Sequence, residues 1–548
     1  RDLRMSRGLG DVYKRQKNDC LGIKELSKLQ AVINICNDKY HTDITFQNIV
    51  QSGLDDPKVY QLLQKGYTQN IFQFSSKGMT KFLVSMQPDK IEDLIAANAL
   101  FRPATLDSGS TDKYVDCKLG DADPVYLWGT YNAMKNTYGV LCYQEQLAQI
   151  AREVGKFSLG EGVKLVKLIS KKKVDKILAL RDKFMTGANE NGCPKEDAEA
   201  IWHMFEVAGG YLFNKSHATA YAVTAYAGAY LKANYPTAFY TIALQWAKDD
   251  EIPTLMSEME LCSEAKIVPP DINVSGGTFI TDYETNKIFW SLSRIKMLGA
   301  KATEWIINER NVRGEFSSIE NFIERIFRYK LKQYKYWDDP DNPNEATKCP
   351  VNARHVRHLI LSGCFDKTEN AQSVIERYAI LEKAAKCLGF EISEKDIPED
   401  LRNKHYFWSQ QQIAISGIGA IDYKRIYDNS EAKPKIKGKA SWALLKNIQD
   451  PDYDGKRVAV CANIVDIEEK KFKDKKTGEN RVFCKLLLQQ NNDLVEMIIW
   501  NDEWMNVRAT LCKGGPLSSA KNKMLICSAQ VKYSDYTCLL YTSPSPRD

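Results

Sequence analysis

Three side chains suited to phosphate chemistry stand together ahead of an alanine-rich segment. Lys215, Ser216 and His217 come directly before a run of small residues that continues to Asn234. The composition of that run predicts a helix, and Ser216 is a residue type that commonly caps helix N-termini. Such a start would place backbone N–H groups and the positive end of the helix dipole beside Lys215 and His217. The segment therefore suits the binding of a triphosphate.

The same helix also has a purely structural interpretation. Ala218, Ala222, Ala225 and Ala229 recur at helical spacing and form a stripe of small side chains that permits close approach of another helix. Tyr226 and Tyr230 lie one turn apart on a neighbouring face. Tight helix packing in a core would explain this pattern without any ligand, so both interpretations stay open at this point.

A second concentration of functional side chains lies near the C-terminus. Basic residues surround a Lys-Thr-Gly-Glu turn; they are Lys470, Lys471, Lys473, Lys475, Lys476 and Arg481. The flanking segments 457–464, 482–488 and 494–500 alternate or run apolar with β-branched residues, which predicts a small five-stranded barrel. A basic hairpin on such a barrel suits single-stranded nucleic acid, although a charged hairpin is often only solvated.

The elements that must position these side chains change in character along the chain. Residues 55–247 show apolar spacing of three and four, which predicts one large helical domain. An extended stretch begins at Val268, and a helix is predicted from Lys301 to Glu309. The polar segment 334–350 predicts an exposed insertion. We expect a mainly α, multidomain α+β protein that ends in a β-barrel.

The two ends of the chain do not look like protein structure. Ser6 to Gln16 can be encoded by a DNA string whose reverse complement, read one base later, encodes Cys538 to Arg547. Two natural termini would almost never share one DNA sequence on opposite strands. We therefore expect residues 1–16 and 538–548 to be a sequencing-adapter artefact. The protein proper would begin near Lys17.

Composition fits a large protein with reduced thiols. The chain has 44% hydrophobic and 27% charged residues, enough for roughly three domains. The net charge of +6 includes three positive charges from residues 1–16, so it is a weak indication of nucleic-acid binding. The 14 cysteines form no C-x-x-C pair, and no apolar run approaches the roughly 18 residues of a membrane span. We expect a cytoplasmic protein without membrane contact.

Many ordered motifs resemble one family, the alpha subunits of bacterial DNA polymerase III, which are family C replicative polymerases. FNKSHATAYA at 213–222 resembles the family's fingers signature. The other matching segments keep the family's order: VYQLL at 59–63, IFQFSSKGM at 71–79, ALFRP at 99–103, YGVLCYQEQLAQIA at 138–151, SLGE at 158–161, YLKANYP at 230–236 and PPDIN at 269–273. The resemblance covers nearly all of residues 17–537.

The resemblance implies a domain order for this C-terminal half of the family. Residues 17–54 would be the end of the palm and its connection, and 55–247 the fingers. Residues 248–449 would be a clamp-binding-type region with tandem helix-hairpin-helix units, and 450–537 an OB-fold. A barrel placed after the fingers is typical of the relatives that lack an inserted exonuclease.

The resemblance also implies a reaction and the residues for it. Asp19 would be a catalytic palm carboxylate and a ligand of one of two Mg²⁺ ions, while the other carboxylates of the family lie upstream. Lys17, Arg102, Lys167, Lys215 and His217 would contact the incoming nucleotide. The family's arginine pair is reduced here to Val166 and Lys167, and Arg102 before a proline could equally be a structural clamp.

Two segments resemble helix-hairpin-helix units, which hold DNA backbone through hairpin N–H groups. They are 293–310, with Gly299, and 351–366, with Gly363; the usual first glycine of the former is Met297. Together with Lys471, Lys473, Lys475, Lys476 and Arg481, these glycines form the predicted DNA contacts. A zinc site of Cys349, His355, His358 and Cys364 is an alternative with unusual ligand spacing.

The function implied is template-directed DNA polymerisation in DNA replication. The expected partners are primer-template DNA, dNTPs, a sliding clamp and other replisome subunits, although the sequence has no clear clamp-binding peptide. We expect this chain to be a fragment that lacks most of the palm and is inactive alone. The alternative is a non-catalytic nucleic-acid-binding protein derived from a polymerase.

Overall fold

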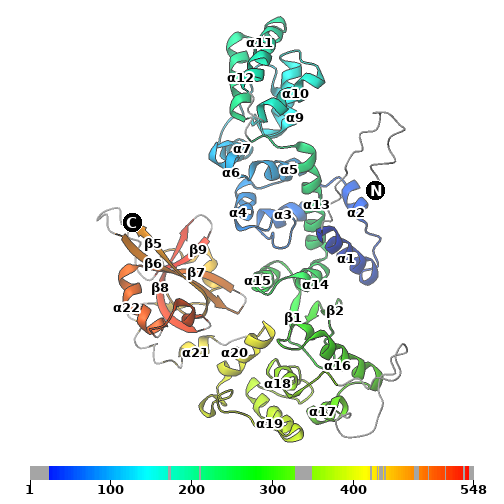
Figure 1. The fold of residues 1–548 in the computed structure, drawn as a ribbon, viewed down its shortest axis with the longest axis vertical. Helices are drawn as coiled ribbons and strands as arrows, with labels where there is room; N and C mark the ends of the chain where they lie inside the picture. The colour runs from blue at the N-terminus through cyan, green and yellow to red at the C-terminus, as the bar shows by residue number, and fades with distance from the viewer. Residues whose placement is uncertain are drawn as a thin grey trace, which may run out of the picture.

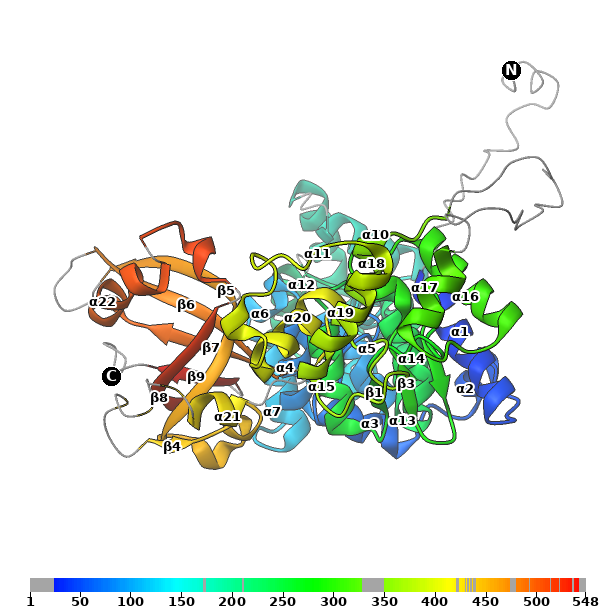
Figure 2. The same ribbon diagram turned by 90° about the horizontal axis from the view of Figure 1, so that it is seen from below.

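The computed structural model describes residues 24–170, 174–208, 211–327, 349–419 and 423–541, the last range with gaps at 429, 431–432, 434–435, 437–439, 474–479, 492, 513, 522 and 535–536. These residues form a mainly helical body with a β-barrel beside it, both in the view of Figure 1 and in the view from below in Figure 2. The predicted fold class, a mainly α protein with a β-barrel, is confirmed. Among the described residues, no helix combines the length and apolar character needed to cross a membrane.

Helix α13 (Lys215–Asn234) is the central element of the largest core. It packs against α5 (Ile91–Leu100), α3 (Pro57–Gln64) and α1 (Lys24–Lys39). The remaining helices of this unit are α2 (Phe46–Gln51), α4 (Lys77–Met86), α6 (Pro103–Asp107), α7 (Ser110–Leu119), α14 (Pro236–Trp246) and α15 (Ile252–Cys262).

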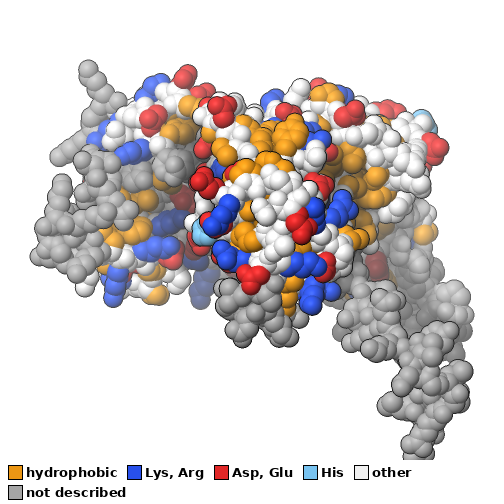
Figure 3. Space-filling view, turned by 90° about the horizontal axis from the view of Figure 1, so that it is seen from above, with side chains coloured by type: hydrophobic (Ala, Val, Ile, Leu, Met, Phe, Trp, Pro, Cys, Tyr) orange, Lys and Arg blue, Asp and Glu red, His pale blue; other side chains and the backbone are white. Residues whose placement is uncertain are grey.

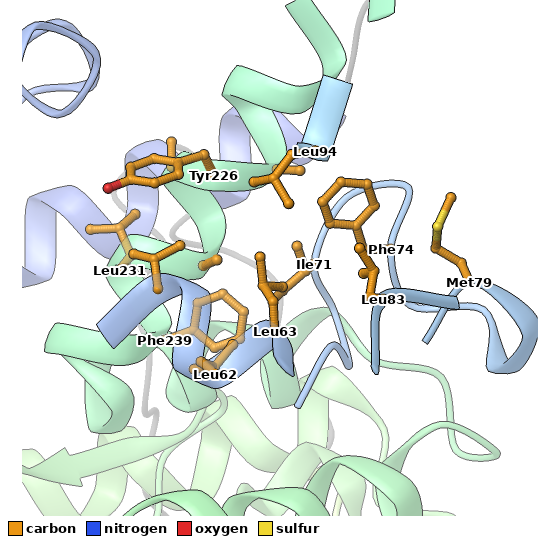
Figure 4. Packing of buried hydrophobic residues seen from close by; sticks show 14 of the residues in the cluster. Leu62, Leu63, Ile71, Phe74, Met79, Leu83, Leu94, Tyr226, Leu231 and Phe239 are labelled. Carbon is orange, nitrogen blue, oxygen red and sulfur yellow. The ribbon is translucent and has the colours of Figure 1, made fainter. Parts of the chain in front are cut away.

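The alanine stripe of α13 is a packing surface. Ala218, Ala222, Ala225 and Ala229 are all completely buried, so the structural interpretation of this stripe is confirmed. Close helix approach lets larger side chains of the neighbouring helices fill the remaining space. Figure 4 shows larger side chains of this core: Leu63 of α3, Leu94 of α5 and Phe239 of α14 lie around α13, which contributes Tyr226 and Leu231 itself.

A second helical core lies at the far end of α13 from α14 (Figure 1). Its elements are α8 (Tyr131–Met134), α9 (Gln144–Glu153), α10 (Leu159–Ser170), α11 (Val174–Glu190) and α12 (Lys195–Ala208). Viewed from this end, acidic and basic side chains are interspersed around an area of hydrophobic ones (Figure 3). That mixture agrees with the modest net charge of the chain.

The third core follows a small three-stranded sheet. Strands β1 (Lys266–Val268) and β3 (Lys287–Phe289) pair in parallel, and β2 (Ile280–Asp282) pairs antiparallel to β3. The helices are α16 (Ala300–Arg313), α17 (Ile319–Phe327), α18 (Ala353–Leu361), α19 (Arg377–Leu388) and α20 (His405–Ser416). Helix α16 confirms the helix predicted over 301–309, whereas most of the predicted insertion lies outside the described residues.

The fourth core belongs to the barrel. Its elements are α21 (Tyr423–Asp428), β4 (Ser441–Trp442), β5 (Arg457–Lys473), β6 (Asn480–Gln490), β7 (Asp493–Ile499), α22 (Asn501–Cys512), β8 (Met524–Ser534) and β9 (Thr537–Tyr541). The strand order is β4-β5-β6-β7-β9-β8, and an additional β5–β8 pairing closes the last five strands. The predicted five-stranded barrel is therefore present, and its arrangement is compatible with an OB-fold. Strand β9 includes four residues of the range 538–548.

Candidate functional site

The start of α13 is set by Asn214 rather than by Ser216. The Asn214 side chain accepts a hydrogen bond from the backbone N–H of His217 at 2.8 Å, and the Ser216 hydroxyl donates to the same oxygen at 2.6 Å. The predicted N-cap was therefore two residues too late. Asparagine and serine cap helices about equally well, and residue type alone does not distinguish them.

An acidic side chain also reaches this helix start. The Lys215 N–H donates to the Glu145 carboxylate at 2.9 Å, and the Lys215 ammonium lies 5.5 Å from the Tyr143 ring centroid. Backbone bonds between Phe213 and the Cys142–Gln144 segment hold α9 and α13 together here. Lys215 is therefore directed toward the start of α9, and Glu145 shares the positive end of α13.

The first turns of α13 instead open onto a cavity of about 540 Å³. It is lined by Gln73, Ser75, Ser76, Met79, Asn98, Phe101, Arg102, Phe213, His217 and Tyr221. These residues come from three segments far apart in sequence: the start of α4 with the loop before it, the α5–α6 junction, and the start of α13 with the residue Phe213 just before it. The cavity thus joins three of the motifs singled out in the sequence.

Aromatic rings form one side of the cavity. The His217 ring lies 4.2 Å from the Tyr221 ring at an interplanar angle of 35°, and 5.6 Å from the Phe213 ring. Phe72 also contacts Tyr221, with ring centroids 5.0 Å apart. The wall therefore offers flat aromatic surface and one titratable nitrogen heterocycle to a ligand.

Arg102 supplies a cation on another wall of this cavity. Its Nε donates to the Ala99 carbonyl at 3.0 Å, a terminal nitrogen donates to the Tyr211 carbonyl, and the guanidinium lies 4.5 Å from the Phe213 ring centroid. Burial lowers the pKa of Arg102 from its ordinary value, but an arginine keeps its charge under these conditions. Arg102 therefore clamps the structure and also lines the cavity, so the two sequence interpretations are compatible.

Other predicted nucleotide-binding residues are not brought to this cavity. Lys167 lies exposed on α10, whereas Val166 beside it is 8% exposed and belongs to the second core. Val166, which stands where the resemblance implies an arginine, therefore packs in an apolar core. Lys17 and Asp19 lie outside the described residues.

The residues of the alternative zinc site have other partners. Nδ1 of His355 accepts the Asn352 N–H at 3.3 Å, and Nδ1 of His358 lies 2.6 Å from the Lys296 carbonyl. Within the described part of the chain, no group of three His, Cys, Asp or Glu could hold a metal ion. The two histidines instead hold the edge of α18 against the first predicted hairpin.

That first hairpin is open and has one unusual backbone conformation. Met297 has a φ of 71° and is 59% exposed, and a side chain at Gly299 would meet no atom within 4 Å. Helix α16 begins directly after Gly299, and Lys296 and Lys301 are exposed on either side. The N–H groups of Leu298 and Gly299 donate to the carbonyls of Ile295 and Met297, so the part of this hairpin that suits a phosphate is the first turn of α16, beside two exposed lysines.

The second predicted hairpin is closed by a side chain. Gly363 has a φ of 91° and is buried, and a Cβ there would lie 2.6 Å from an Arg377 nitrogen. The Arg377 guanidinium also donates to both Asp366 oxygens, at 2.9 and 3.1 Å from Nε. Because Arg377 covers Gly363, this glycine serves close packing, and we do not include it among the proposed DNA contacts.

Part of the predicted basic hairpin is described. Lys471 is exposed at the end of β5, and Arg481 is partly exposed at the start of β6. Lys473 lies in β5, but its side chain is outside the described part, as are Lys475 and Lys476 altogether. Sequence reasoning missed the aromatic cluster of Phe472, Phe483 and Trp500 at this end of the barrel, although the position of Phe472 between Lys471 and Lys473 was a usable signal.

Sequence reasoning also missed most of the uncharged cavity residues. Ser75 and Ser76 stand within the quoted IFQFSSKGM segment, and Tyr221 lies one helical turn after His217. The spacing of His217 and Tyr221 was a signal that both could face one ligand. No comparable pattern marked Gln73 or Asn98.

Two family models match separate parts of the chain. Residues 25–192 match the bacterial DNA polymerase III alpha subunit finger domain, and residues 264–336 match a helix-hairpin-helix motif. The second match contains the open hairpin at Met297 and Gly299.

Curated relatives carry the same name across distant bacteria. The DNA polymerase III subunit alpha of Aquifex aeolicus is 34% identical over 88% of this chain, and that of Campylobacter jejuni is 34% identical over 64% of it. The protein of the same name from Chlamydia muridarum is 29% identical over 89% of the chain. The matched parts cover only 38%, 28% and 38% of these relatives, respectively, so the chain spans well under half of their length.

Proposed function

This chain corresponds to the finger and helix-hairpin-helix region of bacterial DNA polymerase III alpha subunits, and on that premise we propose that its parent protein is a template-directed DNA polymerase. The reaction is deoxynucleotide transfer to the 3′ hydroxyl of a primer during DNA replication. In a bacterial cell, this work takes place on the chromosome in the cytoplasm.

The observation that carries this proposal is the convergence of three motifs on one cavity. Ser75 and Ser76, Arg102, and the His217–Tyr221 pair are separated by up to 146 residues in sequence, yet all of them line the same space of about 540 Å³. Its combination of flat aromatic surface, hydroxyl groups and a fixed cation suits a nucleotide. We assign this cavity to the incoming dNTP.

Within that cavity, the proposed roles follow from the side-chain chemistry. His217 and Tyr221 present ring faces and polar tips to the sugar or base, and Arg102 offers charge to a phosphate. Lys215 and Lys167, which do not line the cavity, and Lys17 are proposed as further phosphate contacts. As single ammonium groups, they supply charge without the bidentate geometry of arginine.

The described residues do not form the metal site that the reaction requires. We propose that the two Mg²⁺ ions belong to the parent protein's palm, with Asp19 as one carboxylate ligand. When bound, such ions activate the primer hydroxyl and neutralise the leaving pyrophosphate. For the chain alone, we accordingly propose binding of primed DNA without extension.

DNA is the proposed partner of the hairpin and the barrel. Gly299 and the start of α16 would hold a backbone phosphate. The template strand would contact the basic hairpin of the barrel, through Lys471, Lys473, Lys475, Lys476 and Arg481. A sliding clamp and other replisome subunits are further proposed partners of the parent protein.

The nucleotide site is tested with the chain and primed DNA, using fluorescence anisotropy of a labelled dNTP. His217→Ala should weaken dNTP binding by about tenfold, because one polar contact and a ring face are lost. Arg152→Gln is the control, since Arg152 is an exposed arginine on α9. Absence of dNTP binding by the unchanged chain, or equal binding by His217→Ala, would contradict the assignment.

Catalysis is tested separately by primer extension. The unchanged chain should retain a primed DNA in a mobility-shift assay and yield no extended product. Extension by the chain alone would refute its proposed inactivity. DNA retention without any dNTP binding would instead favour the alternative function, a non-catalytic nucleic-acid-binding protein.

A further inference from the structure

Three aromatic side chains meet on the outer surface of the barrel. Phe472 of β5, Phe483 of β6 and Trp500, which directly follows β7, lie with ring centroids 5.3–5.9 Å apart. Alternation along β6 and β7 places Cys484 and Ile499 in the barrel core, so their neighbours Phe483 and Trp500 face outward. We call these three residues the aromatic cluster.

Cations are interleaved with the rings by the strand register. Lys470 lies opposite Phe483, and Arg481 lies opposite Phe472, on the same face of the β5–β6 pair. The Lys470 side chain is 46% exposed, and its ammonium lies 3.2 Å from the carboxylate of the exposed Glu468. Such surface pairs are weak and readily exchanged for another anion.

The outer face of β7 leads from this cluster toward the nucleotide cavity. Glu496 on that face pairs with Lys485 at 2.9 Å and lies 3.8 Å from the ammonium of Lys77. Lys77 is the first residue of α4, and the N-cap of that helix, Ser76, lines the cavity. A polymer bound on this face would therefore pass close to the proposed dNTP site.

We propose that the aromatic cluster is a stacking platform for unpaired bases of single-stranded DNA, with Lys470 and Arg481 beside its phosphates. This inference rests on the proposed function, because the strand would be the template. Partly exposed rings interleaved with cations suit a ligand that has both flat apolar faces and regularly spaced negative charges. Base stacking is also tolerant of sequence, as a template contact must be.

The platform is tested by comparing two oligonucleotides of about 12 nucleotides, a length suited to one barrel of this kind. One is oligo-dT, and the other carries abasic sites throughout. Phe472→Ala, Phe483→Ala and Trp500→Leu in the full chain should each weaken oligo-dT binding by roughly 5-fold to 100-fold. None should change binding of the abasic oligonucleotide, because only the bases are lost there.

Two control variants separate stacking from charge and from general damage. Lys470→Gln should weaken binding of both oligonucleotides alike and reduce the salt dependence. Tyr453→Ala removes another ring of the same barrel; the Lys456 ammonium lies 5.0 Å from the centroid of that ring. This variant should change the affinity for neither oligonucleotide. Thermal unfolding of each variant shows whether the barrel is still folded. If Trp500→Leu unfolds the barrel, the comparison of the two oligonucleotides is made with the phenylalanine variants alone.

The proposal is overturned if the ring variants bind oligo-dT as the unchanged chain does, or if they lose both oligonucleotides equally while folded. Labelled dNTP binding distinguishes this failure from failure of the proposed function. The ring variants should keep the dNTP affinity of the unchanged chain, whereas His217→Ala should bind the dNTP about tenfold more weakly and still bind oligo-dT.

Discussion

At the scale of single residues, Met297 occupies a backbone conformation that favours glycine. Its φ of 71° lies in the left-handed region, and its side chain is 59% exposed, so little packing would be lost on truncation. Met297→Gly should therefore raise the free energy of unfolding by about 1 kcal/mol, as measured by urea denaturation.

A matched control is Met505, which is 60% exposed within the regular helix α22. Met505→Gly should lower stability by about 0.5–1 kcal/mol, because glycine is unfavourable in a helix interior. Equal effects of the two substitutions would contradict strain at Met297.

Lys232 is a buried cation that donates hydrogen bonds to two backbone carbonyls and one carboxylate. Its ammonium donates to Glu258 and to the carbonyls of Tyr67 and Gln69, at 3.0 and 2.8 Å for the carbonyls. Burial lowers the pKa of Lys232, and Glu258 also accepts from the Tyr240 hydroxyl at 2.9 Å. Lys232→Met should cost about 3–5 kcal/mol, because Glu258 would remain buried without its cation.

The control for that prediction is the exposed Lys195–Glu199 pair, whose charged atoms are 4.0 Å apart. Lys195→Met should change the free energy of unfolding by less than about 0.5 kcal/mol. The buried-pair argument fails if Lys232→Met is as mild in chemical denaturation followed by circular dichroism.

Residue types predicted more of the site than residue positions did. His217 and Arg102 were identified from the sequence and line one cavity, whereas Lys215 is directed toward Tyr143. The side-chain direction depends on the loop before α13, where Asn214 rather than Ser216 caps the helix. The sequence predicted Ser216 as the cap, and residue type alone does not distinguish it from Asn214, two residues earlier.

At the scale of elements, α11 crosses the end of α9 at a contact between two glycines. A Cβ on Gly187 would lie 2.1 Å from the Gly155 carbonyl oxygen, which is a backbone atom that cannot rotate away. Gly187→Ala should therefore destabilise the second core by at least about 2 kcal/mol, since the helices must separate. Guanidinium unfolding monitored by tryptophan fluorescence provides the measurement.

Gly160 offers the comparison within the same core. It lies in α10, and a Cβ there would meet no atom within 4 Å. Gly160→Ala should be neutral or stabilising by up to about 1 kcal/mol. If Gly187→Ala changes the free energy of unfolding as little as Gly160→Ala does, the contact between α11 and the end of α9 tolerates a wider distance between the two backbones, and the prediction is wrong.

The elements themselves were largely predictable because their patterns are local. Apolar spacing marked α3, α5 and α9, and alternation marked β6 and β7. Local pattern could not reveal that β5 is long enough to pair with both β6 and β8, which closes the barrel. Closure depends on contacts between residues 457–463 and 524–530, which are distant in sequence.

At the scale of the whole molecule, the sequence indicated the succession of units but not their contacts. Composition changes near 267 and 450 separate the helical units from the barrel. The cavity joins residues from 73 to 221, and the barrel reaches the helical body through Glu496 and Lys77. Such arrangements arise from tertiary packing of several elements, and no periodicity along the chain encodes them.

One of these inter-unit contacts should depend on pH. Asp493 of β7 lies against α15, where the Ser257 hydroxyl donates to it at 3.5 Å. Burial, and then the charge of Glu260, raises the pKa of Asp493, while Lys446 and Ser257 oppose the shift. A raised carboxyl pKa means that the docked state binds the proton more tightly, so docking weakens as pH rises through that pKa.

Asp493→Asn removes the buried charge and should strengthen barrel docking at pH 7, with a smaller gain at pH 5, where Asp493 is more protonated. Small-angle scattering checks this as a decrease in radius of gyration at pH 7, and limited proteolysis checks it as slower cleavage between the third core and the barrel. Asp452→Asn, at an exposed carboxylate before β5, should leave both readouts unchanged. The prediction is wrong if Asp493→Asn reduces the radius of gyration, relative to the unchanged chain, more at pH 5 than at pH 7. Burial of the charged Asp493 carboxylate, with Glu260 nearby, would then not weaken the contact between the barrel and the helical body.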